Sequence, residues 1–125
     1  MDYLITTSDD QHYIIIELKS DFTGKEMLQC IVESHSLGQR LGIHRYLVES
    51  RCARNLDNAL DNYKFAHSDM KTTPEVDPLA RVAIIACPDD HSHDFISTTS
   101  KNAGMNLEVF TEPSKAREFL LEDLN

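Results

Sequence analysis

The sequence predicts an α/β fold: a mostly parallel sheet of about five strands, with one antiparallel edge strand and four helices. Three observations lead to this prediction. Two strand-like segments open the chain and are separated only by a short turn. Helix-like and strand-like segments then alternate, which favours parallel strands joined by right-handed crossovers. An unbroken apolar run at 82–87 is typical of a central strand buried on both faces.

The opening hairpin is predicted from residue types. Residues 3–7 are apolar or β-branched, and residues 12–18 are rich in β-branched and aromatic side chains. Ser8, Asp9 and Asp10 between them are turn formers. We therefore expect two antiparallel strands at the start of the chain.

The first helix is marked at both ends. Thr23 and Glu26 match the capping box, in which each side chain accepts from the other residue's backbone N–H. Gly42 can adopt the left-handed conformation that ends a helix. The side chains at spacings of three and four that predict the sheet-facing side are Met27, Cys30, Ile31, Ser34, Leu37 and Leu41.

A short apolar strand is predicted at 46–48, followed by a second helix with Asn55 or Asp57 as its N-cap. The side chains at helical spacing that predict the inner face of this helix are Leu56, Leu60 and Tyr63. Residues 68–78 hold two prolines and several charges without periodicity, so we expect the longest loop there.

The second half of the chain continues the alternation. After the apolar run, a helix is predicted at 90–103, capped by Asp89 or Asp90, with Phe95, Ile96 and Thr99 on its inner face. Residues 107–110 form the last predicted strand. A final helix opens with proline in its first turn, and its predicted inner face consists of Ala116, Phe119, Leu120 and Leu124.

Composition and charge exclude several classes of function. The chain has 125 residues, enough for one domain over residues 1–125 with a core of its own. Its formal net charge is −9 and its basic residues are scattered, so duplex DNA would be repelled and we expect no nucleic-acid partner.

The sequence also predicts a cytoplasmic protein. No segment approaches the roughly 18 apolar residues that a membrane span needs, and the first residues lack the basic and apolar regions of a signal peptide. Cys30, Cys52 and Cys87 are an odd number at wide spacings, which fits neither a disulfide framework nor a paired-cysteine zinc site. We expect reduced thiols.

The order of these elements, with the residues at 46–51, 61–66, 81–85, 102–110 and 116–120, resembles the SpoIIAA-like branch of the STAS fold. This fold is named after sulfate transporters and anti-sigma-factor antagonists, and the resemblance spans nearly the whole chain. It implies a fold more than a function, because its wider relatives include regulatory binding modules and lipid-binding domains.

The resemblance also implies a partner-binding end. Related antagonists carry a phosphorylatable serine after an aspartate, at the start of the helix that follows the third strand. Asp57 and Asn58 align with these positions, so no hydroxyl stands where a kinase would act. We take Asp57 and Asn58 as candidate partner-binding residues.

A candidate ligand site lies where the third and fourth strands end. Arg51, Arg54, Cys87 and His91 follow those strands, and open α/β sheets place ligands at this edge. Arg51 could clamp a carboxylate or phosphate there. Alternatively it pairs with Asp89 or Asp90 and only ties two loops together.

Metal binding and catalysis are not favoured by the motifs. His91 and His93 are suitable ligand types, but two residues apart on a helix they would point in different directions. No nucleophile elbow, phosphate-binding glycine loop, dinucleotide fingerprint or metalloprotease motif is present. We therefore predict no catalytic residue, no metal and no cofactor.

Three functions remain open at this stage. The first is a noncatalytic regulatory or interaction module that binds a protein partner or itself through the region from Arg51 to Leu60. The second is a domain that binds a small ligand, either a lipid or an anionic metabolite, near Arg51 and Cys87. Metal-dependent hydrolysis around His91 and His93 is the least supported.

Overall fold

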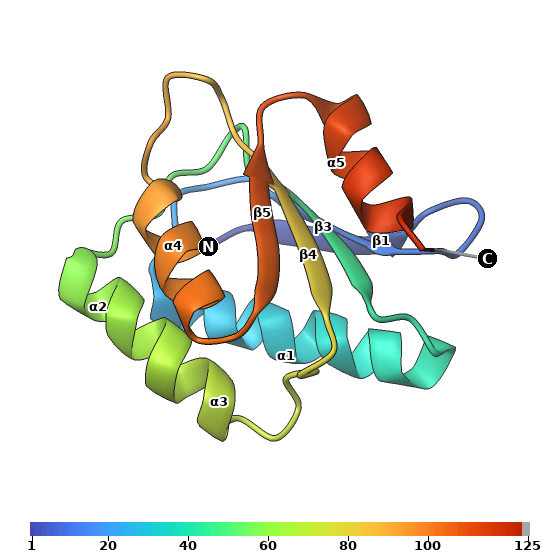
Figure 1. Cartoon of the computed structure of the whole chain (residues 1–125), viewed down its shortest axis with the longest axis horizontal. Coiled ribbons are helices and arrows are strands. Elements are labelled where there is room, and N and C mark those ends of the chain that lie inside the picture. Colours follow the sequence, from blue (N-terminus) through green and yellow to red (C-terminus); the bar gives the residue numbers. More distant parts are fainter. Residues whose placement is uncertain (124–125) are drawn as a thin grey trace.

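The computed structural model describes residues 1–123, and within them the chain forms a five-stranded sheet (Figure 1). The strands lie in chain order: β1 (Tyr3–Thr7), β2 (Ile14–Leu18), β3 (Arg45–Glu49), β4 (Arg81–Ile85) and β5 (Asn106–Phe110). β1 pairs antiparallel with β2, and every other neighbouring pair is parallel. The predicted α/β fold with one antiparallel edge strand is confirmed.

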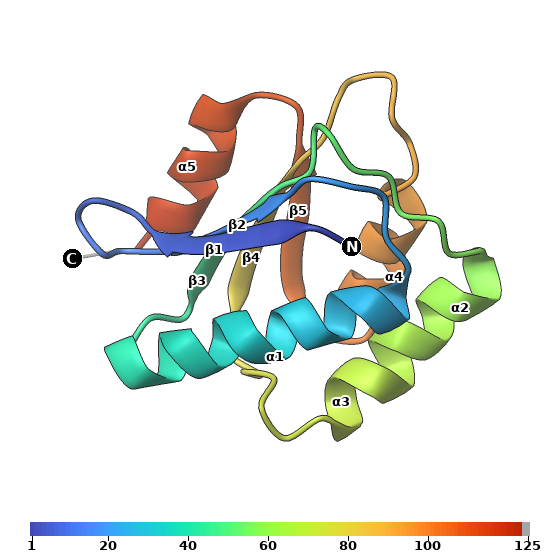
Figure 2. The ribbon, with the colours of Figure 1, turned by 180° about the vertical axis from the view of Figure 1, so that it is seen from behind.

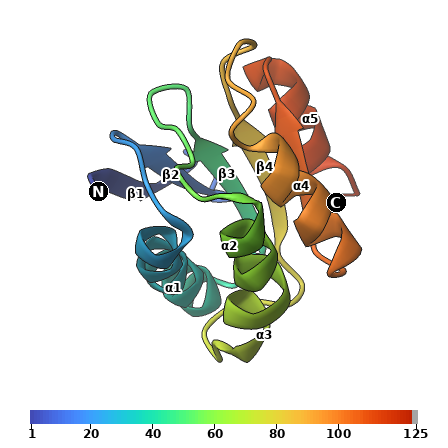
Figure 3. The same ribbon diagram turned by 90° about the vertical axis from the view of Figure 1, so that its left-hand side faces the viewer.

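The helices divide unequally between the two faces of the sheet. One face carries α1 (Gly24–Leu41), α4 (Asp94–Asn102) and a continuous segment made of α2 (Ala59–Lys64), a turn of π-helix η1 (Phe65–Asp69) and α3 (Met70–Thr72). In the described part of the chain, the other face carries α5 (Pro113–Leu121) alone (Figure 3). Strands in chain order joined by right-handed crossovers place every crossover helix on the same face.

The α2–α3 segment does not rest directly on the strands. It packs mainly against α1 on one side and α4 on the other, and lies farther from the sheet than either (Figures 2 and 3). The space beneath it is filled by side chains, among which Asn62, Phe65 and Ala66 are buried. Because this segment is raised, some space is left between it and the sheet.

α1 follows the sequence prediction closely. Glu26 N donates to Thr23 Oγ1 at 3.3 Å and Thr23 N donates to Glu26 Oε1 at 3.0 Å, which completes the capping box. Gly42 ends the helix at a φ of 71°. Leu41, predicted to face inward, is exposed because it belongs to the last turn.

The predicted inner face of the second helix is wrong. Asn58, not Asn55 or Asp57, is the N-cap, and its side chain accepts from Asp61 N at 2.8 Å. Asn55 Nδ2 donates to Asn62 Oδ1 at 2.9 Å in the interior, and this buried bond turns Asn62 towards the core. Consequently the set predicted to face inward is exposed instead: Leu56, Leu60 and Tyr63.

The loop predicted at 68–78 is shorter than expected, because the helix continues through Thr72. Two side chains satisfy backbone carbonyls in this last stretch: Thr72 Oγ1 donates to Ser68 O at 2.9 Å and Thr73 Oγ1 donates to Asp69 O at 2.6 Å. Thr73 is extended, as expected of the residue before Pro74, and ends the helix.

The helix predicted at 90–103 starts later, at Asp94, without a side-chain cap. Asp90 Oδ1 instead accepts from Ser92 N at 2.9 Å, which forms a turn and delays the helix. Ile96 and Thr99 are buried as predicted, whereas Phe95 is exposed.

Two arginines from the sheet hold the end of α5. Arg45 Nη1 donates to the carbonyl oxygens of Leu120 and Glu122. Arg81 Nη1 donates to Phe119 O at 2.9 Å, and its guanidinium lies 5.2 Å from the centre of the Phe119 ring. Cations at a helix C-terminus are favourable. Ala116 and Leu120 are buried as predicted, and Leu124 lies outside the described residues.

The close contact between Gly38 of α1 and Tyr46 of β3 yields a stability prediction. A Cβ there would collide with Tyr46 Oη and lie 2.7 Å from Ile43 O. We expect Gly38→Ala to destabilise the fold by about 1–3 kcal/mol in urea unfolding, although alanine is the better helix former by about 1 kcal/mol. Gln39→Ala, on the exposed side of the same turn, should be neutral. A Gly38→Ala protein as stable as wild type would refute the close approach.

Candidate functional site

The carboxyl ends of β3 and β4 border a shallow pocket of about 360 Å³. We call it the carboxyl-edge pocket; its lining residues are Asp21, Arg51, Cys52, Ala53, Arg54, Cys87, Asp89 and Asp90. The structure thus brings together Arg51, Arg54 and Cys87, three of the four predicted ligand residues. His91 is not part of the lining; it is exposed and pairs with Asp94 at 3.0 Å.

The guanidinium of Arg51 already has a carboxylate partner in this pocket. Its Nε and Nη2 donate to the two carboxylate oxygens of Glu49 at 2.8 and 2.7 Å. The partner is therefore neither Asp89 nor Asp90, the carboxylates weighed from the sequence. Three aspartates line the pocket beside two arginines, so the pocket offers little attraction to an anion.

The two candidate metal ligands lie in different environments. His91 is at the surface, whereas His93 is buried. Over residues 1–123, no three His, Cys, Asp or Glu side chains are placed to share a metal ion. All three cysteines are free thiols: Cys30 is buried, Cys52 is exposed, and Cys87 Sγ donates to Arg51 O at 3.3 Å.

A buried serine–histidine pair joins the end of β3 to the start of α4. Ser50 Oγ donates to Ala53 O at 3.0 Å, so its oxygen accepts from His93 Nε2, also at 3.0 Å. Asp90 Oδ2 lies 3.7 Å from the same nitrogen. In a catalytic pair the serine gives its proton to Nε2 and the acid holds Nδ1. This arrangement does neither, so we interpret the pair as a structural tie.

The predicted partner-binding residues have structural contacts as well. Asp57 Oδ2 accepts from Gly24 N at 2.8 Å and so joins the starts of α1 and α2. Asn58 is exposed and caps α2. Both residues stand at the beginning of the helix, as the alignment with related antagonists requires, and their role in partner binding stays a prediction.

Four exposed apolar side chains lie just before α2, on α2 and on α4, and together they make up a candidate surface. Its members are Leu56 (60% exposed), Leu60 (74%), Tyr63 (54%) and Phe95 (48%), and we call it the α2–α4 surface. The two helices pack side by side (Figure 3), and Asn55 N donates to Ser92 Oγ at 3.0 Å, which fixes their starts together. Sequence analysis found the Leu60–Tyr63 spacing but assigned it to the core.

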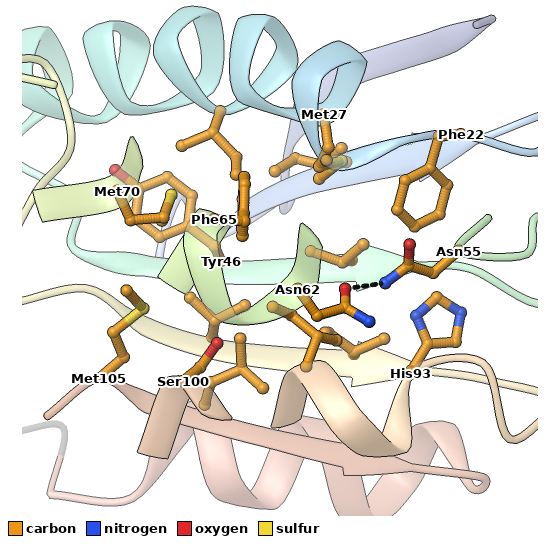
Figure 4. A pocket seen from close by; sticks show the side chains of 18 of the residues that line it. Phe22, Met27, Tyr46, Asn55, Asn62, Phe65, Met70, His93, Ser100 and Met105 are labelled. Carbon is orange, nitrogen blue, oxygen red and sulfur yellow. Dashed lines mark hydrogen bonds between the residues drawn. The ribbon is translucent and has the colours of Figure 1, made fainter. Parts of the chain in front are cut away.

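A second region missed by sequence analysis lies inside the molecule, between the sheet and the helices above it. It is an apolar cavity of about 80 Å³, bordered by β2, β3, β4, α1, α4 and the α2–α3 segment (Figure 4). Few polar side chains reach it: Asn55 and Asn62, which bond to each other, Tyr46, whose hydroxyl donates to Ile43 O, and His35, His93 and Ser100. The sequence signal was a serine at an inward position of α4, four residues after Ile96.

A larger pocket of about 410 Å³ adjoins this interior cavity at the amino ends of β4 and β5, below residues 73–80. We call it the mouth. The two spaces share five lining residues: His35, Met70, Val82, Met105 and Leu107. The mouth and the carboxyl-edge pocket lie at opposite ends of the parallel strands.

His35 belongs to both spaces and is a buried neutral base. Its Nδ1 accepts from Asp77 N at 2.9 Å, and its ring stacks on Tyr46 with the centroids 4.3 Å apart. Burial lowers the pKa of His35 to about 4, against the smaller opposing effect of Asp77. Burial likewise lowers the pKa of His93, with Asp90 opposing it.

Comparison with known proteins supports the architecture. No protein-family model and no curated protein matches the sequence. Among solved structures, the chain is similar to an uncharacterised protein of the DUF3478 family from Shewanella loihica, which is described as having a SpoIIAA-like fold. The identity is 21%, the alignment covers 95% of this chain and 92% of that one, and the TM-score is 0.50. The chain has a SpoIIAA-like fold.

The SpoIIAA-like fold confirms the resemblance stated from the sequence at the level of architecture. Asn58 is the N-cap of α2, the helix that follows β3. In the described part of the chain, no helix is both long enough and apolar enough to cross a bilayer.

The depressed pKa of His35 gives a pH prediction. Its folded pKa of about 4 lies below the ordinary 6.5, so between these values the unfolded state binds more protons and acid favours unfolding. Stability should fall by about 3 kcal/mol from this group as pH drops from 6.5 to 4. The measurement is urea unfolding at several pH values.

Two variants isolate the contribution of His35. His35→Asn keeps an acceptor for Asp77 N and cannot be protonated, so its stability should fall less steeply than that of wild type over this range. His91→Gln, at an exposed histidine, is the control and should keep the wild-type slope. Equal slopes for His35→Asn and wild type would show that His35 is not the sensitive group.

Proposed function

We propose that this chain is a noncatalytic, cytoplasmic interaction module that binds a protein partner through the α2–α4 surface. One observation carries the proposal: of the seven large apolar side chains exposed among residues 1–123, four belong to this surface. Clusters of exposed apolar side chains on a soluble protein mark interaction sites. Leu56, Leu60, Tyr63 and Phe95 therefore form the centre of the proposed interface.

The charges around this surface define the partner. Asp57, Asp61 and Asp94 are sequence neighbours of Leu56, Leu60 and Phe95, Lys64 follows Tyr63, and the whole chain carries a net charge of −9. A complementary partner presents apolar side chains flanked by lysine or arginine. Self-association through this surface would bring acidic groups together, so a different, basic protein is the occupant that we propose.

The contacts in and beside the carboxyl-edge pocket favour a binding role for the chain over a catalytic one. Arg51 is paired with Glu49, and the Ser50–His93 pair lacks the geometry of a nucleophile and base. The acidic lining of the carboxyl-edge pocket also weakens the alternative of an anionic ligand there. Asp57 and Asn58, the candidates from the family resemblance, stand at the edge of the proposed interface.

The interface can be tested with a defined probe. We expect a 14-residue helical peptide of alternating leucine and lysine pairs to bind the wild-type chain in fluorescence anisotropy, and a version with glutamate for lysine to bind more weakly. Leu60→Ser should reduce affinity for the lysine peptide by tenfold or more, because central apolar anchors carry about 2 kcal/mol or more. Added salt should slow association.

Leu79→Ser is the matched control, because Leu79 is 76% exposed but lies in the loop after α3. It should bind the lysine peptide as wild type does. Equal affinities for wild type and Leu60→Ser would refute the α2–α4 surface as an interface. A wild-type dimer in analytical ultracentrifugation that Leu60→Ser dissociates would replace the basic partner with a second copy of the chain.

A further inference from the structure

The interior cavity contains an unsatisfied polar group. Ser100 is 1% exposed, and Ser100 Oγ is the one fully buried side-chain polar atom without a hydrogen-bond partner among the described residues. Figure 4 shows this hydroxyl directed into the cavity, opposite Phe65 and Tyr46. A buried hydroxyl without a partner destabilises the folded chain. A native structure that retains one invites an explanation in a ligand.

Water alone explains this cavity poorly. A single water would leave most of it unfilled, because its volume of about 80 Å³ is several times the roughly 10–15 Å³ that one water needs. A buried water also needs two to four polar partners. The nearby amides of Asn55 and Asn62 bond to each other, and His93 bonds to Ser50, so Ser100 offers an isolated anchor. Cavities lined mainly by apolar side chains accept apolar molecules.

The wall between the cavity and the mouth can rearrange. Met70 and Met105 line both spaces, and Figure 4 shows them together at the Ser100 end of the cavity. Methionine side chains are flexible and fill irregular gaps. Met70 follows the π-turn η1, where Met70 N donates to Phe65 O, and such turns are frequent at functional sites. An entering molecule therefore meets movable side chains.

The charge of the ligand is limited by its surroundings. Among residues 1–123, no carboxylate, lysine or arginine lines the interior cavity. Its two histidines are neutral near pH 7, because burial lowers the pKa of both His35 and His93. A charged group inside would have no counter-charge and would lose its hydration. The buried part of the ligand must therefore be uncharged.

We propose that the interior cavity and the mouth form one binding site for a small, uncharged, mainly apolar molecule whose single hydroxyl group hydrogen-bonds Ser100 Oγ. The apolar body of the molecule contacts Phe65, Ile84 and Leu107, and it enters at the amino ends of β4 and β5. The site is separate from the α2–α4 surface, and it lies at the end of the sheet opposite the ligand site predicted from the sequence.

The test uses 1-alkanols of four to eight carbons with the full chain, followed by NMR of the Met70 and Met105 methyl groups. We expect saturable shifts of both methyls and a dissociation constant that falls about fourfold per added methylene until the space is filled. 1-Fluorohexane has nearly the shape of 1-hexanol without its hydroxyl, and should bind about fivefold more weakly.

Substitutions at Ser100 locate the binding. Ser100→Ala should remove the difference between 1-hexanol and 1-fluorohexane, and Ser100→Leu should abolish the binding of both by filling the cavity. Thr98→Leu, on the exposed side of α4, is the matched control and should bind as wild type does. If Ser100→Leu does not fold, the comparison of 1-hexanol with 1-fluorohexane in Ser100→Ala is the deciding measurement.

Three outcomes would overturn the site: absence of saturable binding by wild type, affinity independent of chain length, or wild-type affinity in Ser100→Leu. A difference between the two hexyl probes that persists in Ser100→Ala would remove the hydroxyl contact. Leu60→Ser should bind 1-hexanol as wild type does, so this inference and the proposed interface can fail separately.

Discussion

The order of the strands constrains most of this structure. Because β2 to β5 lie side by side in chain order and right-handed crossovers are strongly preferred, α1, the α2–α3 segment and α4 must share one face of the sheet. The middle segment packs on its two neighbours and only indirectly on the strands. Its raised position leaves the interior cavity beneath it and presents its outer side chains to solvent.

Buried polar contacts fix the orientation of that raised segment. The Asn55–Asn62 bond sets its rotation, Asp57 joins its start to α1, and the Ser50–His93 pair holds the turn from which α4 begins. Apolar packing alone specifies such an orientation weakly, because many rotations of a helix bury similar areas. With these bonds in place, Leu60 and Tyr63 face outward and Phe65 faces the cavity.

Elements are predicted correctly from the sequence where a local pattern is compatible with one structure only. The capping box at Thr23, the terminating Gly42 and the apolar run of β4 identify their elements, and the resemblance added the architecture.

The prediction from sequence failed at the second helix because two sets of residues both have helical spacing: 56, 60 and 63, and 62, 65 and 66. Only the hydrogen bond between Asn55 and Asn62, seven residues apart, selects the second set as the buried one. Sequence analysis brought Arg51, Arg54 and Cys87 together, but the pairing of Arg51 with Glu49 depends on side-chain geometry. A cavity is the sum of many packing distances, and the inward serine of α4 is the one local signal that it leaves in the sequence.

The interior cavity also affects how the protein responds to hydrostatic pressure. An internal void of about 80 Å³ that is eliminated on unfolding corresponds to a volume decrease on the order of 50 mL/mol, within the usual range for small proteins. Compression therefore favours the unfolded chain. The cavity lies on the helix-covered face opposite α5, which packs on β3, β4 and β5 and is held by Arg45 and Arg81.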